Sequence, residues 1–199
     1  MIRFLGPKLK LLKNLGISIL PNFSQKYILD TKLLKTKGKK TNYFYILKEK
    51  QKLRFNYGLT NHRLKKYINR VKNKKGVLVL NLLKLLEMRL DATLVRTGFW
   101  NSINQAKQFI THGFIFINKI LIKKSNYILE PNDIIHIKSN NIAIRTIIKN
   151  NLRTFKYNKN TNFNYQICIK TLKIKIIRNI TSKELPLKLN NSLLSHLIY

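Results

Sequence analysis

The chain has 199 residues, of which 40 are Lys or Arg and only 7 are Asp or Glu, so its formal net charge is +33. This length allows one sizeable core with a smaller second domain, which disfavours a large catalytic domain beside a binding module. The charge would strain an isolated fold by self-repulsion, so we expect a polyanionic partner, with nucleic acid as the first candidate.

Cysteine and histidine are too sparse for a disulfide framework or a zinc site. The single Cys168 excludes an intrachain disulfide, and the four histidines lie at long spacings. We therefore predict no metal site, and we also expect no cofactor and no small-molecule substrate. No apolar run approaches the roughly 18 residues that span a bilayer, which predicts a soluble chain with no membrane partner. The heavy use of Lys, Asn and Ile is typical of AT-rich genomes, including organellar ones.

The positive charge is concentrated outside the middle of the chain. Residues 1–85 carry 22 basic and 2 acidic side chains, residues 86–138 carry 7 and 4, and residues 139–199 carry 11 and 1. The flanks therefore supply most of the electrostatic field, whereas the central stretch has the patterns that indicate a defined geometry.

The first forty residues form a basic arm and a lysine-rich loop. Organelle transit peptides are also basic and free of acids, but Gly6-Pro7 and Gly16 interrupt any long helix, which favours an arm retained in the mature protein. The loop is either a solvated surface segment or one that becomes ordered on phosphates. The candidate RNA contacts here are Arg3, Gly6, Pro7, Lys8, Lys10, Lys35, Lys37, Lys39 and Lys40.

Two helices are predicted between residues 46 and 73. Gly58 is placed to end the first helix, and Thr60 offers an N-cap oxygen to the second. The apolar residues of the second helix recur at spacings of three and four. Its other side is either an ordinary solvated face or, because acids are almost absent, a phosphate-facing one. The candidate contacts are Lys52, Arg54, Arg63, Lys66 and Arg70.

Residues 77–97 predict one continuous helix, with Gly98 after its end. Arg89 and Arg96 are seven residues apart, so we expect both on one exposed side and available to RNA. Glu87 and Asp91 are more consistent with orienting an arginine, or capping backbone amides, than with acid-base chemistry. Trp100, just after this helix, is expected to be buried rather than stacked on a base.

A capping box predicts a further helix that starts at Ile103. Ser102 would accept from the Gln105 amide while the Gln105 side chain returns to Ser102, and His112-Gly113 would end the helix. Gln105, Lys107 and Gln108 are expected to face outward, and the free amides at its start can seat a phosphate. The candidate contacts are Ser102, Asn104, Gln105, Lys107, His112, Gly113, Lys119 and Lys123.

Short strands are predicted to follow. Residues 114–117 and 120–122 flank Asn118-Lys119, a two-residue hairpin connection, and residues 134–137 follow the turn at 130–133. Residues 142–148 and 165–177 are also strand-like, and the apolar residues near the C-terminus are sufficient to dock on another element. The expected fold class is α+β.

The stretch LEMRLDATLVRTGFWNSINQAKQFITHGFIFIN, with PNDIIHI, resembles the small RNA-binding module of the small-subunit ribosomal protein number four family. RFLGPKLKLLKNLG and EKQKLRFNYGLTNHRLKKYINRVKNKKG resemble that family's N-terminal arm and helical domain, especially in bacterial and plastid members. The closing segment is similar more loosely. Lys119 stands where the family has glycine, and the zinc-binding cysteines of some members are absent.

The resemblance implies a helical domain made of both chain ends, with the module inserted between them. The expected division is an arm and loop at 1–45, a helical rRNA-binding domain at 46–85, the module with its following strands at 86–175, and a returning segment at 176–199. The implied function is that of a structural, non-enzymatic protein of an organellar small ribosomal subunit, plastid or apicoplast before mitochondrion. Its partners would be small-subunit rRNA and neighbouring ribosomal proteins.

Two alternatives remain open at this point. The module also occurs on RNA-modifying enzymes and synthetases, but outside it only Asp30, Glu49 and Glu184 could serve as catalytic acids, and no nucleophile or phosphate-cradling motif is present. A free assembly or quality-control factor would have the same surface chemistry.

Overall fold

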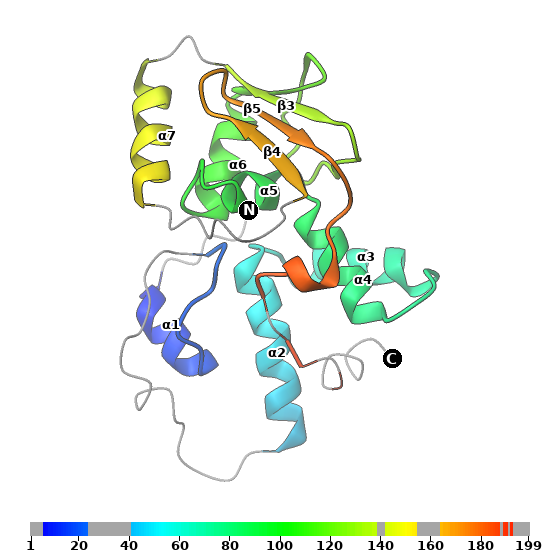
Figure 1. Ribbon diagram of the computed structural model, residues 1–199. Coiled ribbons are helices and arrows are strands. Elements are labelled where there is room, and N and C mark those ends of the chain that lie inside the picture. The colour runs from blue at the N-terminus through cyan, green and yellow to red at the C-terminus, as the bar shows by residue number, and fades with distance from the viewer. Residues whose placement is uncertain are drawn as a thin grey trace. The chain divides into compact units, whose positions relative to one another are not determined.

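The computed structural model describes residues 6–23, 41–138, 142–154, 164–187, 189–190 and 192. The predictions for Arg3, for the lysine cluster Lys35, Lys37, Lys39 and Lys40, and for residues 193–199 fall outside the described residues. The chain divides into two compact units, one formed by residues 1–83 with 186–199 and the other by residues 84–185. Figure 1 shows the course of the chain.

The first unit is helical among its described residues. Its helices are α1 (Lys8–Leu15), α2 (Asn42–Asn56) and α3 (Asn61–Lys72), and α4 (Leu78–Glu87) runs from this unit into the second. Gly16, with φ of 64°, ends α1 in the left-handed conformation that glycine adopts at low cost. Leu12, Leu53 and Val71 are fully buried and belong to the core of this unit.

Local capping fixes the second and third helices, and the sequence predicts two of the residues involved, Gly58 and Thr60. The Thr41 side chain accepts from the amide of Phe44 at the start of α2, and Gly58 follows its end with φ of 55°. The Thr60 hydroxyl accepts from the amide of Arg63 at 3.1 Å, which confirms the predicted N-cap of α3. Leu64, Tyr67 and Val71 are buried, so the apolar spacing also gave the correct face of α3.

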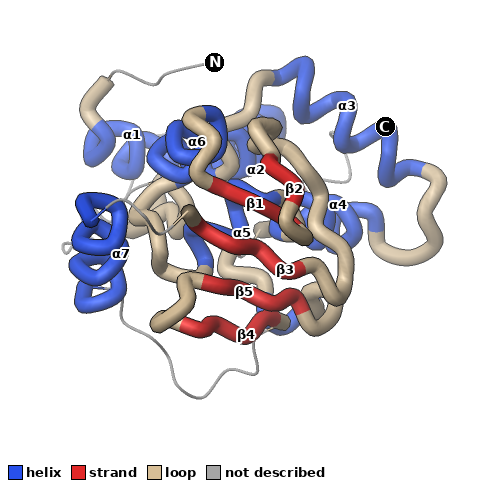
Figure 2. The backbone as a smooth tube through the Cα atoms, turned by 90° about the horizontal axis from the view of Figure 1, so that it is seen from above, coloured by secondary structure: helices blue, strands red, loops and turns tan. Residues whose placement is uncertain are grey.

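The second unit combines helices with one antiparallel sheet, which confirms the predicted α+β class. Its elements are α5 (Leu90–Arg96), α6 (Ile103–Thr111), β1 (Ile115–Ile117), β2 (Ile120–Leu121), β3 (Ile134–Ile137), α7 (Ile142–Thr154), β4 (Tyr165–Cys168), β5 (Lys173–Ile176) and the 3-10 turn η2 (Ser182–Glu184). The strand order is β2-β1-β3-β5-β4. Figure 2 looks onto the sheet, with α5 behind it and α6 beside β1.

The sheet has one buried face and one face that carries polar and apolar side chains outward. Ile117, Ile135 and Ile174 are at most 3% exposed, and each alternates along its strand with an outward residue. Pairing between β3 and β5 sets Ile135 opposite Ile174 and His136 opposite Lys173, so the register keeps the two faces distinct.

The predicted continuous helix over 77–97 is wrong, because the chain breaks between α4 and α5. Arg89 is extended, with φ of −72° and ψ of 144°. The Met88 carbonyl accepts from the Leu129 amide at 2.8 Å, and the Leu90 amide donates to the Tyr127 carbonyl at 2.9 Å. The loop at 125–129 therefore forms hydrogen bonds with the Met88 carbonyl and the Leu90 amide, which a continuous helix would bond within itself. Gly98, with φ of 78°, follows the end of α5 as expected.

Two predictions for the second half of the chain are also corrected. The predicted strand over 142–148 is part of α7, in which Ile144, Ile148 and Asn151 are buried at a helical spacing. The β-branched isoleucines suggested a strand, but the buried positions follow the period of a helix. The strand-like stretch 165–177 is a hairpin of β4 and β5, not a single strand.

Candidate nucleic-acid interface

A buried group of charges fixes α5 against α6. Arg89 Nη2 lies 2.5 Å from Asp91 Oδ2, and Lys107 Nζ lies 3.7 Å from the same oxygen. The side chains of Arg89 and Lys107 are 1% and 2% exposed, and Asp91 is fully buried. The other Asp91 oxygen accepts from the Ala92 amide at 2.9 Å, so this carboxylate both pairs with cations and caps the start of α5.

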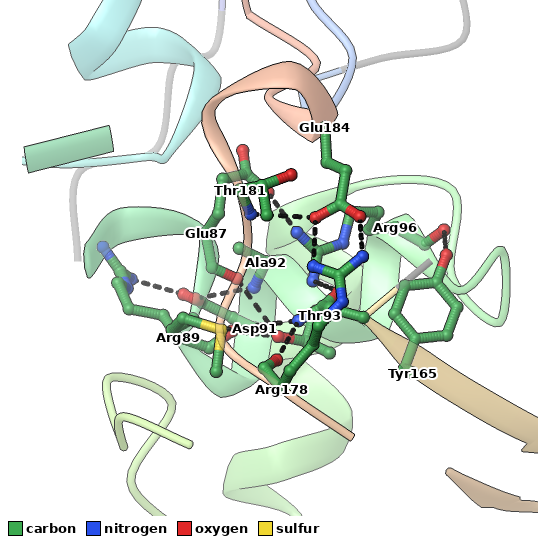
Figure 3. Close-up of polar contacts among 12 residues, drawn as sticks. Glu87, Arg89, Asp91, Ala92, Thr93, Arg96, Tyr165, Arg178, Thr181 and Glu184 are labelled. Carbon is green, nitrogen blue, oxygen red and sulfur yellow. Dashed lines mark hydrogen bonds and ion pairs between the residues drawn. The ribbon is translucent and has the colours of Figure 1, made fainter. Parts of the chain in front are cut away.

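A second ion pair connects α4, α5 and the sheet. Arg96 Nη1 lies 3.5 Å from Glu87 Oε2, and Arg96 Nη2 donates to Asn164 Oδ1 at 2.9 Å. The Tyr165 hydroxyl donates to the Arg96 carbonyl at 2.9 Å, and the guanidinium lies over the Tyr165 ring at 5.3 Å from its centroid. Figure 3 shows Arg89 directed at Asp91, and Tyr165 beside Arg96.

These contacts overturn the predicted surface position of three cations. Arg89 and Lys107 are buried, and the Arg96 side chain is only 9% exposed. The reason is that Arg89 precedes the first turn of α5 instead of lying mid-helix, and Asp91 draws Lys107 inward from α6. The prediction that Glu87 and Asp91 orient arginines is correct.

The loop after β5 ends in an ion pair of its own. Arg178 Nη1 donates to Glu184 Oε2 at 3.1 Å, and the same oxygen accepts from the Thr181 amide at 2.9 Å. Burial alone would raise the pKa of Glu184, but the hydrogen bonds from Arg178 and Thr181 outweigh it and hold the pKa below its ordinary value. The carboxylate in turn raises the pKa of Arg178. The contacts of Glu184 with Arg178 and Thr181 therefore anchor the loop that follows β5.

The start of α6 is capped nearly as predicted. The Ser102 hydroxyl accepts from the Gln105 amide at 3.5 Å, but Gln105 Oε1 accepts from the amide of Asn101, one residue earlier than the capping box requires. Asn104 is exposed and Ser102 half-buried at this helix start, whereas Gln105 is half-buried, not fully outward. Trp100 is 1% exposed, which confirms burial in place of stacking.

The hairpin between β1 and β2 projects a lysine. Asn118 and Lys119 have φ of 49° and 71°, as a type I′ turn requires of both central residues. Asn118 Nδ2 donates to Asp133 Oδ1 at 2.8 Å, and Asn118 Oδ1 accepts from the Ile134 amide at 3.0 Å. Lys119 is exposed, as are Lys123 and the nearby His112. Gly113, with φ of 78°, ends α6.

In the first unit, the predicted residues of α3 present their charge to solvent. Arg63, Lys66 and Arg70 are exposed, and α3 contains no acid. Gly6, Pro7 and Lys10 are exposed at the start of α1. The other candidates of this unit are less available: Lys8 lies over the Phe23 ring at 5.3 Å, Arg54 is half-buried, and Lys52 pairs with Glu49 at 2.5 Å.

Sequence reasoning missed several residues that the structure brings together. Asn164, 68 residues from Arg96, binds that arginine, and no local pattern announces such a contact. Lys173 and Lys175 were detectable, because they alternate with Ile174 and Ile176 in the pattern of a one-sided strand. They lie on the outer face of the sheet.

The described part of the chain contains no group of His, Cys, Asp and Glu that could hold a metal ion. Among the described helices, none combines the length and apolarity that a membrane span needs.

The fold and its charged surface define the class: a strongly basic α+β protein in which a helical unit accompanies a small module of helices and antiparallel strands. Comparison with known families agrees. Residues 3–87 match the ribosomal protein S4/S9 N-terminal domain, and residues 88–135 match the S4 domain.

Curated relatives cover nearly the whole chain. The chain is 45% identical to small ribosomal subunit protein uS4c of Toxoplasma gondii over 170 residues, which are 85% of this chain and 84% of the relative. It is 42% identical to uS4c of Eimeria tenella over 90% of each chain, and 35% identical to uS4c of Mesostigma viride over 97% of this chain and 96% of the relative. The chain belongs to the ribosomal protein S4 family, which confirms the resemblance found in the sequence.

Proposed function

We propose that this protein is a structural constituent of the small ribosomal subunit of a plastid or apicoplast, where it binds small-subunit rRNA directly and nucleates assembly. The relatives named uS4c from Toxoplasma gondii, Eimeria tenella and Mesostigma viride support the plastid-type ribosome over a mitochondrial one. The observation that carries the RNA-binding part is the exposed cationic side of α3, which has no acid within the helix.

The mechanism divides between charge and geometry. Exposed cations of the first unit, namely Lys10, Arg63, Lys66 and Arg70, would neutralise phosphates with little sequence discrimination. The module would contribute position through the capped start of α6 and the lysines of the hairpin, Lys119 and Lys123. Folded RNA is read mostly through shape and through its sugar-phosphate backbone, so such a surface is sufficient.

A structural role, not an enzymatic one, is favoured by the contacts of five of the six acids that the structure describes. Glu49, Glu87, Asp91 and Glu184 each face a cation in an ion pair, and Asp133 accepts from Asn118 and from the Glu130 amide. Carboxylates held in this way orient side chains and backbone, and they are poorly placed to exchange protons with a substrate.

A salt titration of binding to small-subunit rRNA tests this function. Release of counterions predicts a linear fall of log affinity with log salt, with a slope of about −0.7 to −0.9 for each phosphate contact. Several contacts therefore give a steep dependence. A flat response, or equal binding to an unrelated folded RNA of the same length at every salt concentration, contradicts the proposal.

Cofractionation separates the ribosomal role from that of a free factor. A structural constituent stays with mature small subunits of the organelle through a high-salt wash, whereas an assembly or quality-control factor dissociates. Recovery only with immature particles would assign the chain to assembly.

A further inference from the structure

The outer face of the sheet in the second unit combines lysines with apolar and aromatic side chains. Across β1, β3 and β5, the register places Phe116 opposite His136 and His136 opposite Lys173. The next row places Ile134 opposite Lys175. Residues directly opposite in an antiparallel pair have their Cβ atoms about 4.5–5.5 Å apart, so these side chains form one continuous surface.

Part of this face is hollowed into an open groove. Its lining combines the apolar and aromatic side chains of Phe116, Ile134 and His136 with those of Asn118, Lys119, Lys138 and Lys173. Phe116 and His136 are half-buried, Ile134 is 41% exposed, and the lysines are exposed. Figure 2 shows β1, β3 and β5 lying side by side in this sheet.

The charge of this surface is of one sign. Among the described residues, Lys119, Lys138, Lys173 and Lys175 make no ion pair, whereas every ion-paired cation of the second unit lies elsewhere. The acid nearest in sequence to the groove, Asp133, already accepts from Asn118 and from the Glu130 amide. An anionic occupant would therefore meet four unneutralised lysines.

The apolar lining distinguishes this surface from an ordinary solvated face. A sheet face that only meets water carries polar residues at its outward positions, whereas Phe116 and Ile134 are apolar here. Single-stranded nucleic acid requires both features, because its bases stack on rings and its phosphates pair with cations. An extended strand of RNA has the length to cross the three strands.

We propose that the outer face of this sheet binds a single-stranded stretch of RNA, with unpaired bases on Phe116 and His136 and phosphates on Lys119, Lys138, Lys173 and Lys175. This inference rests on the proposed rRNA-binding function and adds a further RNA site, separate from the α3 surface and from the start of α6. The hairpin lysine Lys119 would serve at its edge.

The test measures binding of the full-length protein to a fluorescent eight-nucleotide oligouridine, with two variants of the face. Phe116→Thr with His136→Thr removes the rings and keeps strand-forming side chains. Lys138→Gln with Lys173→Gln and Lys175→Gln removes three charges. The matched control, Arg145→Gln with Lys149→Gln and Arg153→Gln, removes three exposed charges from α7 in the same unit.

The two variants should fail in different ways. Loss of the rings lowers affinity on the order of ten-fold and leaves the salt slope unchanged, because stacking releases no counterions. Loss of the three lysines makes the slope shallower by about 2, at roughly 0.7 for each single-strand contact. The α7 control should retain both affinity and slope within a factor of about two. A ring variant that binds like the original protein overturns the proposal.

A photo-crosslink gives a readout that does not depend on the folding of a variant. Oligouridine carrying one 4-thiouridine should attach to peptides from β1 or β3 of the unaltered protein, and attachment only to α3 or to α6 overturns the proposal. If an oligoglutamate of equal charge competes as well as oligouridine, the face is a site for an acidic protein segment and the proposal is likewise overturned.

Failure of this inference is distinguishable from failure of the ribosomal function. Affinity for intact small-subunit rRNA is measured in parallel on the same samples. If the unaltered protein binds the rRNA but the oligouridine data exclude the sheet, only the inference fails. If it does not bind the rRNA, the proposed function fails whatever the oligouridine result.

Discussion

Cations in the two units differ in whether an acid lies beside them. In α3, Arg63, Lys66 and Arg70 are exposed in a helix without acids. At the contact of α5 and α6, Arg89 and Lys107 are buried around Asp91. Five of the seven acids of the chain lie in residues 84–185, so the second unit has more acids with which to hold cations in its interior, while the exposed cations of α3 stay available to a polyanion.

The comparison teaches that the position of the few acids indicates the role of the many bases. A buried ion pair contributes little net stability, but removal of one partner is costly because it strands the other charge. An exposed cation contributes little to folding and much to phosphate binding. Four predictions test this division, from the largest expected effect to the smallest.

The largest effect is expected for Arg89→Ala, which should lower the free energy of unfolding of the module by about 3 kcal/mol. This is the lower end of the range for a broken buried pair, because Lys107 remains 3.7 Å from Asp91. Urea unfolding followed by fluorescence of the single tryptophan, Trp100, reports on this unit. Lys123→Ala, which alters an exposed lysine of the same unit, should change the free energy of unfolding by less than about 0.5 kcal/mol. If the two substitutions lowered the free energy of unfolding equally, buried and exposed cations would not differ in their role in folding.

The exposed cations of α3 should act on binding without affecting stability. Arg63→Gln with Arg70→Gln should weaken binding to small-subunit rRNA by roughly ten- to a hundred-fold at about 0.1 M salt, and make the salt slope shallower by about 1.5. Lys65→Gln with Lys72→Gln removes the same charge from the other exposed side of the helix. If both pairs have the same effect, the helix contributes a diffuse field and not a binding face.

The hairpin residue Lys119 should show a conflict between folding and binding. With φ of 71°, a lysine here has a backbone conformation that costs about 1 kcal/mol relative to glycine. Lys119→Gly is therefore expected to raise the free energy of unfolding by about 1 kcal/mol and to weaken oligouridine binding. Lys119→Asn is the control that removes the charge with less change in the turn. Stabilisation without loss of binding would assign Lys119 no part in RNA contact.

The smallest effect is expected at the loop pair of Arg178 and Glu184. The folded state holds the pKa of Glu184 below its ordinary value of 4.5. Its contribution to stability is therefore complete above pH 4.5 and is lost as the pH falls through the lowered pKa. Glu184→Gln should be slightly less stable than the original protein at pH 7, and the difference should shrink in acid. Urea unfolding at several pH values checks this, and a difference that grows in acid would contradict it.

Part of the fold followed directly from local sequence. The Thr60 and Ser102 caps, the glycines that end helices and the Asn118-Lys119 turn were all predicted correctly, since each depends on contacts within about four residues. The α+β class followed from the order of these signals along the chain, whereas the family followed from the resemblance of longer stretches to it. The sequence by itself determined closely where α6, β1, β2 and β3 begin and end.

Tertiary structure decided which charges face the solvent and where two elements break or change type. The helix over 77–97 is interrupted because the loop at 125–129 binds the backbone of Met88 and Leu90, a contact that helical periodicity does not encode. Arg89 and Lys107 are buried because both pair with Asp91. Arg96 is largely buried because it pairs with Glu87 and donates to the distant Asn164. Whether a cation supports the fold or binds RNA depends on which acid lies beside it in space, and that is settled only when distant segments pack together.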